Sequence, residues 1–415
     1  MATTTLASVL DLIRTAGPIS RVELAQRTGL TAATITHTVR DLLGGGLVRE
    51  AGRRPGAVGS PRRLLDLAPD AWYAVGVQLS RCATTTVITD FTGRRLVSAH
   101  SPGVGDGPPG DTLTALAAHV EQLLTSAAVP RERVLGLGLV THGPQDRERG
   151  MILTAQPTPA WQRFPLAGTL AELLSLPVLL ENDATAAAVS ERWTGTVDVR
   201  TFGVVWVGGG IGGGVVIDGE GFGGAGANPV EIGHVPLDPA ATLCACGNRG
   251  CAEVTAGPAA VVAQAAADPL ERVRLRLSGH PDDTLTDFER LAVAAERGDD
   301  RASRLLRASA ERLADAVVTM MNLFDLDTVV LSGPALVTAG PVYAEAATRA
   351  AGRGALARLL RPVRVLVSPD AGTAAAVGGA LVVLRSPLVH AEPRGTTPGD
   401  TARPVGTARP KAPAP

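Results

Sequence analysis

The sequence predicts an α/β fold in which a small winged helix-turn-helix domain precedes two larger, strand-rich lobes. Stretches of helical apolar spacing fill residues 5–43, and two short strands follow them. From residue 72 onward, apolar strands alternate with helical stretches, the pattern of α/β domains. A chain of 415 residues, 45% of them hydrophobic, is long enough for two or three domains.

The first 68 residues contain the expected helices and wing. Residues 5–15 have the apolar period of a helix that ends at Gly17-Pro18. Ser20 and Glu23 have the spacing of a capping box, which starts a second helix over 21–28. Thr31 caps a third helix that continues to about residue 43. Strands at 47–50 and 64–67 then enclose a basic turn.

This domain is basic, with nine arginines against four acidic residues in residues 1–65 of a chain whose net charge is −1. A basic domain on a near-neutral protein indicates a polyanionic partner. Polar residues at the start of the third helix suit base edges in the major groove, and the wing arginines suit phosphates. The alternative is a helical domain used only for dimerisation. The candidate DNA-binding residues are Ser20, Arg21, Thr31, Thr34, Thr36, His37, Arg40, Arg53, Arg54, Arg62 and Arg63.

The larger region is expected to divide into lobes at 72–191 and 192–384, followed by a Pro-rich disordered tail at 385–415. Strands are predicted at 73–79, 84–90, 96–100, 134–140, 178–180, 328–332 and 363–367, with a glycine-rich hairpin at 204–217. Helices are predicted at 112–127, 166–174, 258–267, 286–297, 301–323 and 374–384. No signal peptide and no apolar run of membrane-spanning length is visible, so we expect a cytoplasmic protein.

Three of the chain's four cysteines lie within eight residues, shortly after a histidine. One imidazole and three thiolates complete a tetrahedral shell for Zn²⁺, which leaves no open position and makes the metal structural. The alternatives are free thiols or a disulfide, which is rare in cytosolic proteins. The candidate ligands are His234, Cys244, Cys246 and Cys251, and two carboxylates, Glu231 and Glu253, bracket them.

The stretch Glu-Ile-Gly-His followed by Cys-Ala-Cys-Gly-Asn-Arg-Gly-Cys-Ala-Glu, residues 231–253, resembles the signature of the ROK family (repressor, open reading frame, kinase). The resemblance runs from about residue 5 to residue 384. It implies a two-lobed actin-like, ribonuclease-H-like fold of the ATPase type and a structural zinc. Glu181-Asn182-Asp183-Ala184 matches the family's sugar motif, in which the Asp is the catalytic base of the kinases. From spacing alone, a cap of the following helix is the safer interpretation of Asp183. The implied sugar-binding residues are Asn182, Asp183, Glu231, His234 and Glu253.

The nucleotide half of the expected site departs from the family pattern. Kinases of the family have Asp-x-Gly-Gly-Thr after the first strand, where this chain has Gln78-Leu79-Ser80-Arg81-Cys82. Phosphoryl transfer depends on positioning and charge stabilisation, so this loss predicts that the protein is not a kinase and that Asp183 is a vestigial base. The glycine-rich hairpin is a partial match to a second phosphate motif, but glycines also simply make tight turns.

These features together predict a sugar-responsive transcriptional repressor of carbohydrate genes. The expected partners are duplex operator DNA, a sugar or sugar phosphate bound between the lobes, and further copies of the chain in a homodimer or homotetramer. One alternative is a sugar kinase that carries a DNA-binding head. Another is a constitutive DNA-binding protein whose sugar lobe no longer binds a ligand.

Overall fold

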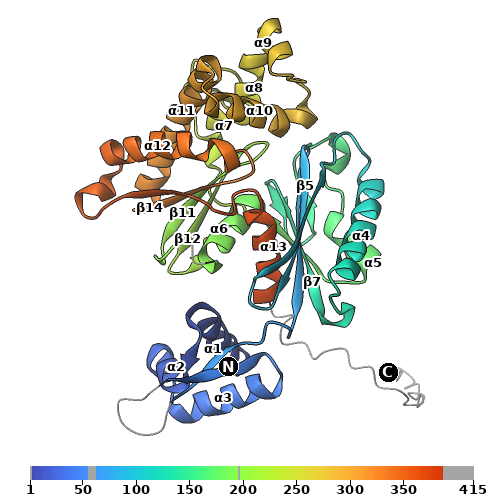
Figure 1. The fold of residues 1–415 in the computed structure, drawn as a ribbon, viewed down its shortest axis with the longest axis vertical. Coiled ribbons are helices and arrows are strands. Elements are labelled where there is room, and N and C mark those ends of the chain that lie inside the picture. The colour runs from blue at the N-terminus through green and yellow to red at the C-terminus, as the bar shows by residue number, and fades with distance from the viewer. Residues whose placement is uncertain (1, 55–61, 195–196, 387–415) are drawn as a thin grey trace, which may run out of the picture.

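The computed structural model describes residues 2–54, 62–194 and 197–386, which form a small N-terminal domain, called the head below, and two lobes (Figure 1). The tip of the expected wing and nearly all of the expected tail lie outside these residues. No helix of the described ranges is long and apolar enough to span a membrane.

The head has the arrangement expected of a winged helix-turn-helix. Its helices are α1 (Ala2–Ala16), α2 (Arg21–Thr28) and α3 (Ala32–Gly44). The strands β1 (Ile19–Ser20), β2 (Val48–Arg54) and β3 (Arg62–Leu67) form an antiparallel sheet in the order β1-β3-β2. The predicted capping box is confirmed, since Ser20 and Glu23 exchange backbone and side-chain hydrogen bonds. The apolar faces of α1 and α3 meet in a core that contains Val9, Ile13, Ile35 and Val39.

The first lobe is built on a mixed five-stranded sheet of order β10-β7-β4-β5-β6. Its strands are β4 (Tyr73–Leu79), β5 (Ala83–Asp90), β6 (Arg95–Pro102), β7 (Val134–Thr141) and β10 (Val178–Asn182). Buried residues of α4 (Pro109–Ser126) and α5 (Leu166–Leu174) share one core with this sheet. A small hairpin, β8 (Gln145–Asp146) and β9 (Met151–Ile152), follows β7.

The second lobe is built on another five-stranded sheet, of order β13-β12-β11-β14-β15. Its strands are β11 (Phe202–Val207), β12 (Ile211–Ile217), β13 (Glu220–Gly221), β14 (Thr328–Ser332) and β15 (Arg364–Val367). Its helices are α7 (Ala252–Ala256), α8 (Pro258–Ala266), α9 (Pro269–Arg274), α10 (Thr284–Glu296), α11 (Asp300–Phe324) and α12 (Leu336–Gly354). The sequence reading did not identify α9 or α12, and α12 contains Pro341.

Two helices, α6 (Asp183–Trp193) and α13 (Ala374–Arg385), pack against each other between the two sheets (Figure 1). Helix α6 packs on β11 and β12 of the second lobe, while α13 packs on β4, β5 and β7 of the first. The sequence-based division had placed residues 374–384 in the second lobe, but this last helix returns to cover the first lobe's sheet. The α6–α13 pair therefore forms the boundary between the lobes.

Candidate functional site

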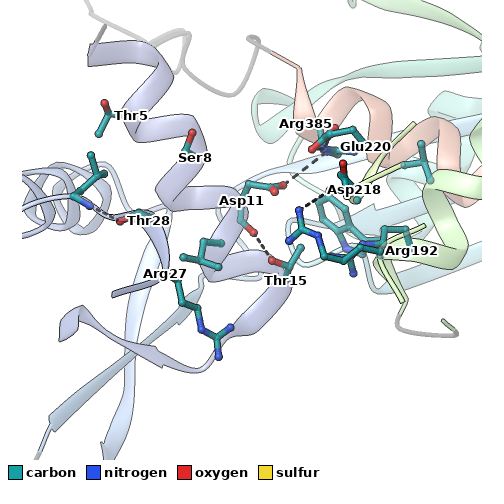
Figure 2. A pocket seen from close by; sticks show the side chains of 16 residues that line it. Thr5, Ser8, Asp11, Thr15, Arg27, Thr28, Arg192, Asp218, Glu220 and Arg385 are labelled. Atoms are coloured by element: carbon teal, nitrogen blue, oxygen red, sulfur yellow. Dashed lines mark hydrogen bonds and ion pairs between the residues drawn. The ribbon is translucent and has the colours of Figure 1, made fainter. Parts of the chain in front are cut away.

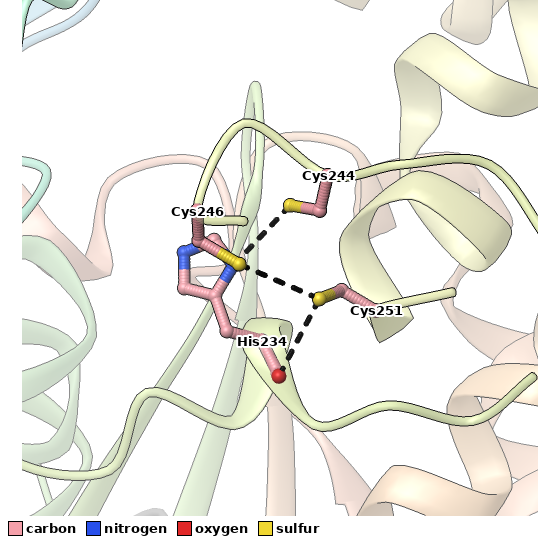
Figure 3. A group of neighbouring side chains, drawn as sticks. All are labelled: His234, Cys244, Cys246 and Cys251. Carbon is pink, nitrogen blue, oxygen red and sulfur yellow. Dashed lines mark hydrogen bonds between the residues drawn. The ribbon is translucent and has the colours of Figure 1, made fainter. Parts of the chain in front are cut away.

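The four candidate metal ligands converge into one cluster (Figure 3). His234 ends a short 3-10 helix (Ile232–His234), and the three thiols come from the loop that leads into α7. Their ligand atoms all lie within 4.8 Å of one another. Tight turns at Gly247 and Gly250, both with positive φ, fold the loop back so that the thiols meet.

The spacing of these atoms fits a tetrahedral metal. Zinc–sulfur bonds of about 2.3 Å in a tetrahedron place neighbouring sulfurs about 3.8 Å apart. Here the Sγ atoms of Cys246 and Cys251 are 3.6 Å apart, and Cys244 Sγ is 3.6 Å from His234 Nδ1. Because Nδ1 faces the thiols, the other ring nitrogen of His234 is left for a different partner. The residues present therefore fit Zn²⁺.

The metal cluster also positions two acidic side chains. Glu231 directly precedes the helical turn that carries His234, and Glu253 lies in the first turn of α7, two residues after Cys251. Glu253 Oε2 accepts a hydrogen bond of 3.2 Å from the backbone N–H of Ile211, at the start of β12. The cluster, its two carboxylates and the glycine-rich hairpin are thereby joined into one unit.

Asn182 and Asp183 lie opposite this unit, at the end of β10 and the start of α6. Asn182 is the N-cap of α6, because its Oδ1 accepts the N–H of Thr185. The carboxylate of Asp183 accepts the N–H of Ala184 at 2.8 Å. A Cβ built on Gly212 of β12 would lie 3.6 Å from Asp183 Oδ1, so the carboxylate lies against the hairpin strand. The N-cap of α6 is thus Asn182 and not Asp183. The second carboxylate oxygen of Asp183 is left for a ligand.

Asp183 has an unusual charge state. The pKa of Asp183 is raised from 3.8 to about 7, mainly by burial and in smaller part by the charges of Glu231 and Glu253, while the N–H of Ala184 opposes the rise. A carboxyl group that titrates near neutral pH is a marker of a functional site, because a buried structural carboxylate normally has a charged partner. The carboxylates of Asp183, Glu231 and Glu253 therefore form an acidic group suited to hydroxyl donors.

Sequence reasoning missed a contact that joins the lobes beside this group. The backbone N–H of Gln145 donates to Asn228 Oδ1 at 2.6 Å, and Asn228 Nδ2 donates back to the carbonyl of Gln145 at 2.9 Å. A Cβ on Gly143 would lie within 3.4 Å of polar side-chain atoms of Asn182, Glu231 and Asn228. The sequence gives no sign of this contact, because Gln145 and Asn228 are 83 residues apart.

The loop between β4 and β5, the expected nucleotide half of the site, is occupied by its own side chains. Ser80 Oγ donates to the carbonyl of Ala83, which closes the turn between β4 and β5. Arg81 forms ion pairs with Asp106 of the first lobe at 2.8 Å and with Asp282 of the second lobe at 2.7 Å. Its guanidinium also donates to the carbonyl of Pro157. The side chain of Gln78 is 7% exposed within the sheet.

In the head, the candidate DNA-binding residues differ in their availability. Ser20 is 2% exposed and its hydroxyl is used in the capping box, so we leave it out of the proposed interface. Thr36 and Arg40 are exposed on α3. Two wing arginines are paired, Arg54 with Glu23 at 3.1 Å and Arg63 with Glu50 at 2.8 Å. Of the remaining candidates, Thr31, His37, Arg53 and Arg62 are exposed, and Arg21 and Thr34 are partly buried.

Two α/β lobes with a Cys₃His cluster, preceded by a winged helix-turn-helix head, define the class of protein, and comparison identifies the family. The ROK family model matches residues 74–386, so the chain belongs to the ROK family. It is 27% identical to the DNA-binding transcriptional repressor Mlc of Escherichia coli K12 over 80% of this chain and 81% of that protein. It is also 27% identical to the xylose repressor of Caldicellulosiruptor bescii, over 76% and 79%. An N-acetylglucosamine repressor of Escherichia coli O6:H1 matches at 27% identity, over 79% of each chain.

Solved structures support the fold. A ROK family transcriptional regulator described as a homologue of Escherichia coli Mlc superposes with a TM-score of 0.74 at 23% identity, over 95% of this chain and 99% of that one. A ROK family glucokinase from Streptomyces griseus, solved with glucose and AMPPNP, superposes with a TM-score of 0.61 at 25% identity, over 75% and 98%. The kinase match leaves out about a quarter of this chain, as expected if the head has no counterpart there.

Proposed function

We propose that this ROK family protein is a sugar-responsive repressor, in which a sugar or sugar phosphate binds between the lobes and alters binding of the head to operator DNA. The observation that carries the proposal is the contrast between the two halves of the site. In the expected sugar half, acidic side chains from both lobes converge. In the expected nucleotide half, Arg81 fills the loop where the family's kinases have glycines, and it pairs with both lobes.

The sugar would be held by hydroxyl contacts. Asn182, Asp183, Glu231 and Glu253 provide carboxylate and amide acceptors, and His234 offers the ring nitrogen that does not face the thiols. The names of the relatives suggest glucose, xylose and N-acetylglucosamine as the first candidates to test. A structural Zn²⁺ on His234 and the three thiols would hold the loop that positions the two glutamates.

Kinase activity is not part of the proposal. Backbone amides can approach phosphates only where glycines leave room, and Ser80 and Arg81 take that place. The relatives named as repressors favour the same conclusion. Asp183 would then act as a hydrogen-bond acceptor for the sugar and not as a catalytic base. The alternative remains a ROK kinase with a DNA-binding head.

The exposed face of α3 and the basic strands of the wing would contact DNA in the cytoplasm. An α-helix fits the major groove, where Thr36, His37 and Arg40 would meet base edges, and the wing arginines would meet phosphates. Arg54 and Arg63 would exchange their carboxylate partners for phosphates on binding. A homodimer or homotetramer would present two heads to two half-sites.

Two measurements test the proposal. A thermal-shift screen with glucose, xylose, N-acetylglucosamine and their phosphates should identify a ligand, since a binder stabilises the fold by mass action. That ligand should then change the affinity for DNA selected from a random-sequence library. ADP release that depends on ATP and sugar, at ordinary kinase rates, would favour the kinase alternative. DNA binding without a response to any sugar would favour a constitutive DNA-binding protein.

A further inference from the structure

One arginine of the head is buried against the sensor. Arg14 lies near the end of α1, and its side chain is only 4% exposed. Its guanidinium stacks over the ring of Trp193 at 4.4 Å and over that of Phe91 at 5.5 Å. Its Nη2 donates to the carbonyl of Leu384 at 3.2 Å. Burial lowers the pKa of Arg14 to about 10, so the group remains a cation at neutral pH.

The contacts of Arg14 are the C-terminal ends of the two helices that separate the lobes. Trp193 is the last residue of α6, and Leu384 lies in the last turn of α13. The same helix α6 begins with Asp183 of the candidate sugar site. At 1.5 Å per residue, its 11 residues place that site about 15 Å from the head along one continuous helix.

These two helices are packed too closely to change shape independently. A Cβ on Gly378 of α13 would lie 1.8 Å from the backbone carbonyl of Ala186 in α6. A Cβ on Gly214 of β12 would lie 2.4 Å from the carbonyl of Ala184, in the first turn of α6. Helix α6 is therefore held between α13 and the hairpin strand by backbone contacts. A shift at its first turn must move its last turn as well, because close-packed elements transmit displacement.

The surroundings of Arg14 suggest that this docking can change. Its buried Nε–H has no hydrogen-bond partner among the described residues, which is a cost that a different head position would avoid. Next to it lies a hollow of about 430 Å³ between the head and the second lobe (Figure 2). A second contact at its edge is more exposed, with Arg385 pairing with Glu220 at 2.7 Å and approaching Asp11 at 3.8 Å.

We propose that Arg14 is the positioning residue of the head, and that its stack on Trp193 carries the state of the sugar site along α6 to the DNA-reading helix. This inference rests on the proposed function. Arg14 touches neither DNA nor sugar. It fixes the orientation of the head by binding the ends of both inter-lobe helices at once, so a movement of the α6–α13 pair changes the position of the head.

The test uses the full chain and the substitution Arg14→Lys, which keeps the charge but removes the planar, forked guanidinium. Operator affinity is measured with and without the probe sugar, taken from glucose, xylose and N-acetylglucosamine, that stabilises the wild type. The wild-type ratio should be at least about fivefold, the lower end of typical allosteric coupling. In Arg14→Lys the ratio should fall towards one, while the sugar still raises the melting temperature.

Arg131→Lys is the control, because Arg131 likewise binds a helix-end carbonyl, of Leu174, and an acidic residue, Glu121, but both of these partners belong to the first lobe. It should keep the wild-type ratio. Trp193→Phe provides a second variant if Arg14→Lys folds poorly, and it should lower the ratio in the same direction. A lower melting temperature with an unchanged ratio in both variants would reduce Arg14 to a structural role and overturn the proposal.

A readout without ligands separates this inference from the proposed function. Hydrogen exchange should rise in Arg14→Lys both in α1 and in the last turn of α6, because the two are joined through the stack. Unchanged exchange at both places overturns the inference, whatever the sugar does. If instead the exchange rises but no sugar alters DNA binding of the wild type, the contact positions the head and the proposed function is what fails.

Discussion

Replacing Asp183 by Asn should change both the stability of the protein and its binding of sugar, in a way that depends on pH. Because the pKa of Asp183 is raised from 3.8 to about 7, the folded state binds more protons than the unfolded state between these values. Stability therefore falls as the pH rises through this window, and the loss is complete above the folded pKa. At about 1.36 kcal/mol per pKa unit, the wild type should lose about 2–3 kcal/mol relative to Asp183→Asn between about pH 5 and pH 8.

The assay is thermal denaturation of both proteins across this pH range, with and without the sugar that binds. The difference in melting temperature between Asp183→Asn and wild type should grow by several degrees toward higher pH. Wild-type sugar affinity should increase roughly tenfold between about pH 6 and pH 8, because the ionised carboxylate of Asp183 accepts a hydrogen bond from a sugar hydroxyl. Asp183→Asn should bind weakly at every pH.

Asp111→Asn is the control, since it makes the same change at an exposed position in the first turn of α4. Its stability difference from wild type should not grow with pH. The reasoning is refuted if Asp183→Asn and wild type keep a constant difference across the range, or if wild-type sugar affinity does not rise with pH.

Four further changes have distinct expected outcomes. Native mass spectrometry should find one zinc per chain, lost in Cys251→Ser and retained in Cys82→Ser, which removes the cysteine outside the cluster. Arg40→Ala should weaken operator binding by about 1–3 kcal/mol and relax its sequence preference, whereas Arg304→Ala, exposed on α11, should change neither. Gly378→Ala should destabilise the fold by at least 1–3 kcal/mol as measured by denaturation, while Gly352→Ala, with open space around its Cβ, should not destabilise it. Arg81→Gln should lower the melting temperature without adding ATP-dependent phosphorylation, which a coupled assay would detect.

The parts of the site that the sequence predicted are those made by residues close together in the chain. The metal cluster comes from one short loop after His234, and the capping box of α2 needs only Ser20 and Glu23. Local spacing fixes such features, because turn and cap geometry depends on a few neighbouring residues. Most of the longer strands and helices were also predicted close to their observed bounds, since apolar periodicity is a local signal. The two-residue strands β1, β8, β9 and β13 were not predicted.

What the sequence reading missed depends on distant packing. Helix α12 contains Pro341, a helix breaker by propensity, but packing on α11, β14 and β15 stabilises it. No local pattern in the sequence signals the return of α13 to the first lobe or the Gln145–Asn228 contact between the lobes. In each case tertiary contacts decide the outcome, and a single sequence does not reveal them.

The Arg81 loop bears on how such a fold can respond to sugar without nucleotide. In a phosphoryl-transfer enzyme, phosphates between the lobes are held by groups from both sides. Here Arg81 of the first lobe pairs with Asp282 of the second, so a side chain joins the lobes at that end. A sugar that contacts Asp183 and Glu253 would then act on lobes that are already attached. The difference in sugar affinity between two states of the protein would then move the α6–α13 pair, which is the displacement that Arg14 would pass to the head.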